Sequence, residues 1–275
     1  MATSTRIDAL DEHDVEAFRR DGAVCLRGAL SAAELELLKA GIDDNLAHPS
    51  PRAKVASSAT DPGFFIEDFC SWTENERYRR FIFESRLGAI AGRLTGSSSI
   101  RLYHDHMLTK EPGTRQRTPW HQDQPYYNVD GNQTVSLWVP LDPVVAEVCP
   151  KFLAGSQADG KLYVPKRFKT NAALEGDTSH YTPFDGVDEV AEKARLRFWA
   201  LQPGDAIAFN FKTLHNAPPN TSANRRRAIS FRFFGDDARH AVRPHAVSPP
   251  YPEMGLTAAH AAVLPEEWFP VVWHA

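Results

Sequence analysis

The most informative segment of this sequence is TPWHQDQPYYNVDG, residues 118–131. It places His121 and Asp123 two positions apart, shortly after a proline and a tryptophan. A His-x-Asp pair on its own most often marks a polar strand end. The same spacing also suits two ligands of one metal ion, so the interpretation depends on whether the chain offers a third ligand.

The candidate for a third ligand is His215, in the segment FKTLHNAPPN. It follows the apolar segment DAIAFNF and precedes a turn rich in proline and asparagine, as a residue at a strand end would. Two histidines and one carboxylate form the facial triad that binds non-haem Fe(II) and leaves coordination positions open for reactants. The sequence therefore predicts a metal site made of His121, Asp123 and His215.

An arginine lies eleven residues beyond His215, at the start of the strand-like segment RRRAISFRFFGD. Because side chains alternate between the faces of a strand, Arg226 shares its face with the small residues Ala228 and Ser230. Its two arginine neighbours fall on the other face, with Ile229, Phe231 and Phe233. We expect Arg226 to point into a cavity, where its planar fork could bind a carboxylate with two hydrogen bonds.

Flanking segments predict the fold. Short stretches rich in β-branched and aromatic residues, separated by turns such as EPGT and QPGD, are SIRLYHDHMLTK, TVSLWVPLD, ARLRFWAL, DAIAFNF and RAISFRFFGD. Helical segments precede them: DEHDVEAFRRDG, SAAELELLKAGIDDNL with a capping box of Ser31 and Glu34, and NERYRRFIFESRLGAIAGRL. This order predicts a mainly β protein, a sandwich or barrel behind an N-terminal helical layer.

Length and composition predict a single domain. The 275 residues are 42% hydrophobic, and no linker divides them. We expect N-terminal helices at about residues 11–96, a β core at about 99–240 and a C-terminal tail at 241–275, with its aromatic residues folded back on the core. Residues 48–63 are rich in turn formers and are expected to form a loop.

Charge and cysteine content narrow the function classes. A net charge of −4 offers no footprint for nucleic acid or anionic lipid. The N-terminus lacks the apolar segment of a signal peptide, and no run reaches the ~18 apolar residues of a membrane span. Three widely spaced cysteines suggest neither a disulfide framework nor a zinc site. These features predict a cytoplasmic protein with no nucleic-acid or membrane partner. A small-molecule substrate is expected, and the choice between a monomer and a homodimer stays open.

The residues together resemble the phytanoyl-CoA dioxygenase family of Fe(II)/2-oxoglutarate oxygenases. The resemblance runs from about residue 12 to about residue 240, through YHDHMLTKEPG, TPWHQDQPYY, VSLWVPLDP, FLAGS, PGDAIAF and LHNAPPNTSANRRRAIS. It implies a double-stranded β-helix, or jelly roll, with iron bound by His121, Asp123 and His215. It also implies that Arg226 holds the distal carboxylate of 2-oxoglutarate, with Trp138 and His106 in contact with this co-substrate.

The chemistry implied by the resemblance consumes O2 and 2-oxoglutarate, releases succinate and CO2, and oxidises a second substrate. Related halogenases lack the carboxylate that Asp123 supplies, so hydroxylation, desaturation or ring closure is expected here. The segment AEVCPK replaces the acidic-Asn-Gly turn that is usual in the family, and two single positions also depart from the family pattern. Gln157 stands where a histidine is usual, and Ala217 replaces a serine that often helps to hold the co-substrate, a loss of about 1 kcal/mol if nothing compensates.

Two other interpretations stay open. His104, His106 and Glu111 imitate a cupin metal motif, although its flanking glycines are missing. A catalytically silent jelly-roll binding module is the second alternative, which a broken triad would favour.

Lys110 is expected at the surface. The prime substrate is expected to be a small or medium-sized metabolite, selected by loops at 48–63, 124–133 and 156–193.

Overall fold

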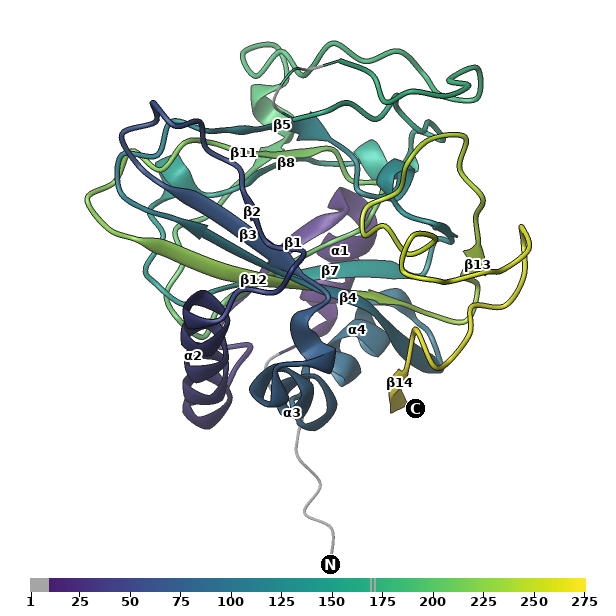
Figure 1. Ribbon diagram of the computed structural model, residues 1–275, viewed down its shortest axis with the longest axis horizontal. Coiled ribbons are helices and arrows are strands. Elements are labelled where there is room, and N and C mark those ends of the chain that lie inside the picture. The colour runs from purple at the N-terminus through teal and green to yellow at the C-terminus, as the bar shows by residue number, and fades with distance from the viewer. Residues whose placement is uncertain (1–9, 169, 171) are drawn as a thin grey trace, which may run out of the picture.

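Two antiparallel sheets face each other in the computed structural model, which describes residues 10–168, 170 and 172–275 (Figure 1). They form a double-stranded β-helix, as the family resemblance implied. Residues 1–9, part of the N-terminal stretch examined for a signal peptide, lie outside the described residues. No helix in the described part of the chain is both long enough and apolar enough to cross a membrane.

The larger sheet has eight strands among the described residues, in the order β1-β10-β7-β12-β4-β3-β2, with β14 also paired to β4. Its strands are β1 (Ala23–Leu26), β2 (Lys54–Val55), β3 (Phe65–Phe69), β4 (Ser99–Lys110), β7 (Thr134–Pro140), β10 (Ala206–Phe209), β12 (Arg226–Phe234) and β14 (Val271–His274). The two longest, β4 and β12, pair side by side at the centre. They carry many of the residues that matter for the site.

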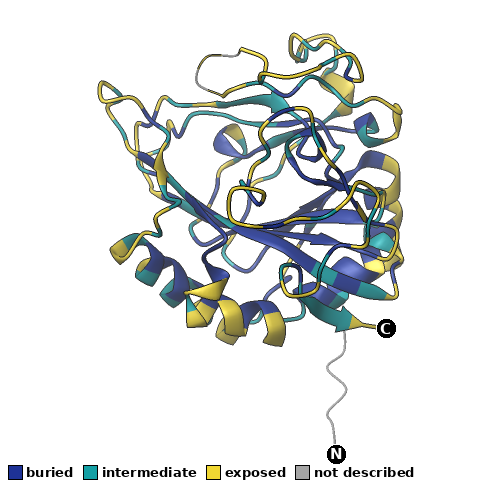
Figure 2. Ribbon diagram, turned by 45° about the vertical axis from the view of Figure 1, so that its right-hand side comes forward, coloured by how far each residue is buried: buried dark blue, intermediate teal, exposed yellow. Residues whose placement is uncertain are grey.

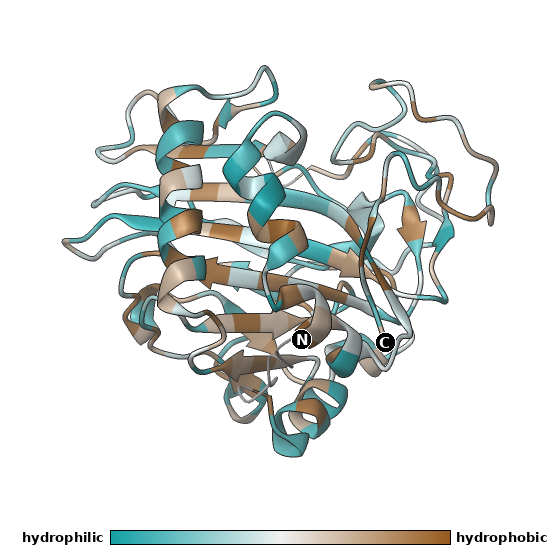
Figure 3. Ribbon diagram, turned by 90° about the horizontal axis from the view of Figure 1, so that it is seen from below, coloured by the Kyte–Doolittle hydropathy of each residue, from teal (hydrophilic) through white to brown (hydrophobic). Residues whose placement is uncertain are grey.

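Four helices lie against one face of this sheet: α1 (Glu12–Asp21), α2 (Ala32–Ala47), α3 (Glu76–Glu84) and α4 (Leu87–Thr95). The expected capping box begins α2, since Ser31 and Glu34 cap each other's backbone amides. Helix α1 ends at Gly22, whose φ of 74° is left-handed and suits glycine. Figure 3, seen from below, shows apolar strand segments behind these helices. The main apolar core lies between the two layers.

The smaller sheet covers the other face and has the order β5-β11-β8-β9. Its strands are β5 (Thr118–His121), β8 (Lys151–Leu153), β9 (Leu196–Arg197) and β11 (His215–Ala217). A two-stranded sheet joins β6 (Val129–Asp130) to β13 (Arg239–His240). Short 3-10 helices are η1 (Ser71–Thr73), η2 (Gln124–Tyr126), η3 (Ala146–Val148), η4 (Ser156–Ala158) and η5 (Lys193–Arg195).

The C-terminal segment packs back onto the core, as expected from its aromatic residues. Phe269 is fully buried and stacks on Tyr103, with ring centroids 5.5 Å apart. Trp273 in β14 packs against Gly88 and Gly92 of α4, where side chains would leave no room for its ring. Figure 2 shows the sheet interior buried, with exposed residues on the outer faces of the helices and in the loops.

Two local expectations differ from the structure. The segment 48–63 is not purely a loop, because Lys54 and Val55 pair with β3 and add an edge strand. The segment ARLRFWAL supplies only the two residues of β9. Both differences arise from tertiary pairing, since an edge strand needs a partner and a strand-like sequence without a long partner stays irregular.

Candidate metal centre

The two candidate histidine ligands lie opposite each other on neighbouring strands of the smaller sheet. His121 ends β5, His215 begins β11, and the antiparallel register pairs them directly. Their ring centroids are 4.2 Å apart. Asp123 follows two residues later, where the chain leaves β5 and turns into η2, and its backbone amide is anchored to the carbonyl of Phe211. Strand pairing thus brings together ligands from distant parts of the sequence.

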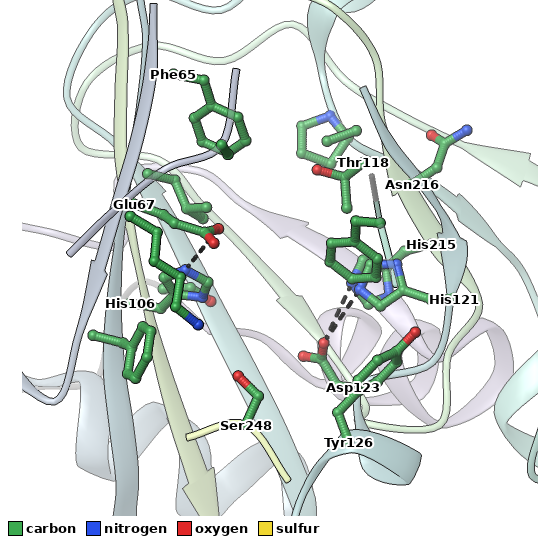
Figure 4. A pocket seen from close by; sticks show the side chains of 18 of the residues that line it. Phe65, Glu67, His106, Thr118, His121, Asp123, Tyr126, His215, Asn216 and Ser248 are labelled. Carbon is green, nitrogen blue, oxygen red and sulfur yellow. Dashed lines mark ion pairs between the residues drawn. The ribbon is translucent and has the colours of Figure 1, made fainter. Parts of the chain in front are cut away.

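The three side chains converge on one point (Figure 4). The Nε2 atoms of His121 and His215 lie 3.5 and 3.7 Å from Oδ1 of Asp123, and the potential ligand atoms are all within 4.8 Å of one another. Each histidine Nδ1 lies near a backbone carbonyl, at 2.8 Å from Pro119 and 2.9 Å from Thr213. If Nδ1 donates its proton there, Nε2 is left free to bind a metal. This donor set fits iron.

The second carboxylate oxygen of Asp123 is held by other residues. Ser136 Oγ donates to Oδ2 at 3.2 Å, and Nε of the buried Arg232 lies 3.5 Å from the same atom. Arg232 also donates to the hydroxyl of Tyr127. Burial raises the pKa of Asp123, but the Arg232 charge and the histidines outweigh it and hold this pKa well below its usual value. The carboxylate is therefore ionised, with Oδ1 facing the histidines.

Arg232 was not identified from the sequence, although a signal for it exists. It lies on the same face of β12 as Arg226, three alternations further along the strand. Burial lowers the pKa of the other ligand, His215, to about 3, with a further contribution from His121. His215 is thus neutral at neutral pH, as a metal ligand must be.

A cavity of about 830 Å³ opens beside the cluster, between the two sheets. All six predicted site residues line it. Parts of the three loops expected to select the substrate also line it, and an unexpected contribution comes from the C-terminal residues 246–248. In Figure 4, the triad and Tyr126 form one wall, while Glu67 and His106 form the wall opposite.

Arg226 points into this cavity and is only 5% exposed. Its guanidinium donates to the carbonyl of Val148 and has no acidic partner at ion-pair distance among the described residues. Its neighbours differ: Arg225 pairs with Glu111 at 2.7 Å, and Arg227 pairs with Asp142 at 2.8 Å. Burial lowers the pKa of Arg226 to about 10, so it stays charged at neutral pH. A buried charge without a counter-ion fits a carboxylate ligand.

Lys110 corrects the expectation that it is a surface residue, because it is 2% exposed. It pairs in register with Arg226 across β4 and β12, and it lines the same cavity. Its Nζ donates to the carbonyl of Gln116 at 2.8 Å and lies 4.6 Å from the centre of the Phe65 ring. The prediction was wrong because β3 and the chain before β5 cover this end of β4.

The two remaining predicted co-substrate contacts also reach the cavity. Trp138 in β7 is 6% exposed and lies across from Ser230 of β12. His106 lies in the wall opposite the triad, with Nε2 3.4 Å from Oε2 of Glu67. Their roles stay predictions. Of the two single-residue departures from the family pattern, Ala217 lines the cavity, whereas Gln157 donates to the carbonyl of Arg19 at 3.1 Å.

The cupin-like pattern does not form a metal cluster. Strand alternation turns Asp105 away from His104 and His106, and its carboxylate accepts the backbone amides of Ser71 and Trp72 at 3.0 and 3.1 Å. Glu111 pairs with an arginine, as described above. Within the described residues, the set of three or more potential ligands that converges is the His121, Asp123 and His215 triad.

The fold and this triad together define a jelly-roll protein with two histidines and one carboxylate arranged to bind a metal between its sheets. The family model for phytanoyl-CoA dioxygenase matches residues 18–228. The chain belongs to this family.

The curated relatives share only a low fraction of identical residues with this chain. "Dioxygenase lolE1" of Epichloe uncinata is 25% identical over 158 residues, which cover 54% of this chain and 52% of that protein. The "Phytanoyl-CoA dioxygenase domain-containing protein 1 homolog" of Dictyostelium discoideum is 28% identical over 120 residues, 42% of this chain and 40% of that protein. The chain thus spans about half, or less, of the length of these curated relatives.

A solved structure shares the fold. The epimerase SnoN, in complex with Fe3+, alpha ketoglutarate and nogalamycin RO, superposes with a TM-score of 0.73 at 24% identity. The match covers 95% of this chain and 98% of SnoN. At this identity the likeness establishes the common architecture.

Proposed function

We propose that this protein is an Fe(II)- and 2-oxoglutarate-dependent dioxygenase that hydroxylates a small or medium-sized metabolite and releases succinate and CO2. The observation that carries the proposal is the convergence of His121, Asp123 and His215 in the wall of a cavity that also contains a buried, unpaired Arg226. One feature fits a divalent metal and the other fits a carboxylate. The presence of iron and alpha ketoglutarate in the related SnoN structure supports both assignments.

In this proposal His121, Asp123 and His215 would hold Fe(II) in the wall of the cavity. Bound iron, 2-oxoglutarate and O2 together supply the oxidising power that breaks a substrate C–H bond, while 2-oxoglutarate is converted to succinate and CO2. Arg226 would hold the distal carboxylate of 2-oxoglutarate. Ser136 and Arg232 contact Oδ2 of Asp123, which leaves Oδ1 facing the two histidines. Trp138 and His106 are proposed to contact the co-substrate or the molecule beside it.

The cavity supports a small-molecule substrate. Its volume of about 830 Å³ lies in the upper part of the range typical of small-molecule sites. A molecule of 2-oxoglutarate fills only a small part of this cavity, so the remaining space can admit a second molecule of moderate size. Asp123 occupies the position that a halide would need, which favours hydroxylation, or a related oxidation, over halogenation.

A non-catalytic binding module is the alternative from a different class. The complete triad and the ionised Asp123 argue against it, because such a module has no need of an arrangement that binds metal.

We further propose one domain over residues 1–275, a monomer or homodimer, and a cytoplasmic location. The location is supported by the three cysteines, Cys25, Cys70 and Cys149, none of which forms a disulfide.

An anaerobic titration tests the proposal. The apo-protein should bind one Fe(II) per chain and then 2-oxoglutarate, giving a weak visible charge-transfer band. His121→Ala should abolish the band, and the exposed His180 provides a control, since His180→Ala should leave it intact. On admission of air, the wild-type protein should form succinate slowly even without a prime substrate. A band that persists in His121→Ala would show that the ligands are misassigned, and succinate at the level of a no-enzyme control would favour the binding module.

A further inference from the structure

Two buried basic side chains lie side by side at one end of the cavity. Lys110 and Arg226 are 2% and 5% exposed, and they are direct register partners on β4 and β12. Neither has an acidic side chain at ion-pair distance among the described residues. Ionised groups are rarely buried without a partner, because desolvation costs several kcal/mol per ion. Such a pair fits an anionic ligand.

The nearby acidic side chains that the structure describes form no ion pair with Lys110. Arg226 approaches from β12 and repels it, while Glu67 on β3 and Asp61 in the preceding loop attract it. Glu67, however, pairs with His106 at 3.4 Å, and Asp61 accepts backbone amides of Gly63, Arg115 and Gln116. Burial, followed by the Arg226 charge, therefore holds the pKa of Lys110 well below its usual value.

Besides these charges, Lys110 contacts neutral groups. Its Nζ donates to the carbonyl of Gln116 at 2.8 Å and lies 3.4 Å from that of Pro218. A neutral amine has two protons to donate, which these two carbonyls can accept. The same nitrogen can take up a third proton when a negative charge arrives beside it.

We propose that Lys110 is a second residue that binds the distal carboxylate of 2-oxoglutarate, and that binding of the co-substrate brings one proton from solvent onto the Lys110 amine. The inference rests on the proposed function, since it needs 2-oxoglutarate at Arg226. The balance is simple: a neutral amine and a proton form an ammonium ion, while the carboxylate stays ionised. The free site then carries one cation, and the complex carries two cations and one carboxylate.

The proposal predicts how the affinity for 2-oxoglutarate changes with pH. Bound carboxylate favours the charged amine, so the pKa of Lys110 is higher in the complex than in the free protein. Between these two pKa values binding takes up a proton, and the affinity for 2-oxoglutarate falls as pH rises. Below the lower value the amine is already charged, and the affinity no longer depends on this group.

Anaerobic calorimetry can measure the proton directly. The Fe(II)-loaded protein is titrated with 2-oxoglutarate between about pH 6 and about pH 9, in buffers of different ionisation enthalpy at each pH. Wild-type protein should take up as much as one proton at some pH within this range. Lys110→Met should take up none and should bind 2-oxoglutarate ~10-fold more weakly at neutral pH, as expected for the loss of one charge-assisted contact.

Two further variants make the result specific. Lys110→Arg keeps a permanent charge, so it should bind 2-oxoglutarate without proton uptake and with a flatter pH dependence. Lys54→Met removes an exposed lysine of the same cavity and should keep the wild-type uptake. Thermal unfolding and the charge-transfer band show whether each variant is folded and binds iron.

The outcomes separate this inference from the proposed function. Normal 2-oxoglutarate binding without proton uptake, or with the same uptake in Lys110→Met and Lys110→Arg, overturns the role of Lys110 and leaves the oxygenase proposal standing. Absence of any 2-oxoglutarate binding to iron-loaded wild-type protein overturns both.

Discussion

The two faces of strand β12 serve different purposes. Toward the helices it presents Ile229, Phe231 and Phe233, all fully buried in the main apolar core. Toward the cavity it presents Arg226, Ala228, Ser230 and Arg232. One face is satisfied by packing within the protein. The other holds Arg226, which has no acidic partner among the described residues, and the Ser230 hydroxyl, which has no hydrogen-bond partner among them. A single strand thus contributes to stability through the residues of one face and to ligand binding through the residues of the other.

The largest loss of activity is expected on replacement of Asp123, the triad carboxylate that Arg232 contacts from the cavity face of β12. Asp123→Gly removes the only carboxylate of the triad, and iron binding and substrate oxidation should be largely lost. Halogenation in the presence of excess chloride should stay slight, because no prepared surroundings hold the halide. Product analysis by mass spectrometry checks this. Efficient chlorination by the variant would show that Arg232 and Ser136 already form a halide site.

On the opposite face, Phe231→Ala should damage folding and spare the site. Phe231 is fully buried and stacks on Phe81 of α3, with ring centroids 5.1 Å apart. Removal of a buried aromatic ring should lower the free energy of unfolding by about 3–5 kcal/mol. Urea denaturation measures the loss. Below the unfolding transition, the affinity for 2-oxoglutarate should match the wild type, and a clear change there would break the separation between the faces.

Arg226→Ala should have the opposite effect to Phe231→Ala, weakening 2-oxoglutarate binding more than folding. The affinity for 2-oxoglutarate should fall by two or more orders of magnitude, about 3 kcal/mol, because a partly buried carboxylate loses its charge-assisted partner. Arg225→Ala and Arg227→Ala are matched controls that remove arginines with acidic partners. Both should bind 2-oxoglutarate nearly as well as the wild type. If either control matched the Arg226 effect, the assignment of faces would be wrong.

Arg232→Met should weaken metal binding without removing a ligand. This guanidinium steadies Oδ2 of Asp123, and loss of such an outer contact typically lowers metal affinity ~10- to 100-fold. Competition with a chelator of known iron affinity provides the measurement. Arg232→Lys, which keeps the charge, should recover part of the affinity. Equal losses in both variants would indicate a packing role instead.

The smallest effect is expected for Ser230→Ala. Ser230 is 1% exposed, and its hydroxyl has no hydrogen-bond partner among the described residues. Loss of an unpaired buried hydroxyl should change the free energy of unfolding of the ligand-free protein by less than about 1 kcal/mol. Its neighbour Ile229, changed to alanine, should cost about 2–5 kcal/mol. Comparable losses at the two positions would contradict the contrast between the faces.

Sequence patterns were sufficient where the determining signal is local. Strand alternation separated Arg226 from its neighbours, the capping box located the start of α2, and the family pattern indicated the jelly roll. The proximity of His121 and His215 was predicted from the ligand chemistry and again implied by the resemblance. The antiparallel pairing of their strands was not predicted, because strand register depends on contacts between distant segments. The burial of Lys110 was missed for the same physical reason: separate segments cover it. Arg232 was missed because a cavity-facing arginine in an aromatic strand looks like a surface charge.

The antiparallel pairing of β5 with β11 has a consequence for the lifetime of the protein. A metal bound to His121 and His215 would tie these short strands together, as a crosslink between distant parts of the chain does. Without metal, such short strands should open more often than the large sheet. Their backbone amides should then exchange with deuterium faster, and proteases should cut this region first. Metal supply would thus set how long each molecule survives, independently of how fast it turns over substrate.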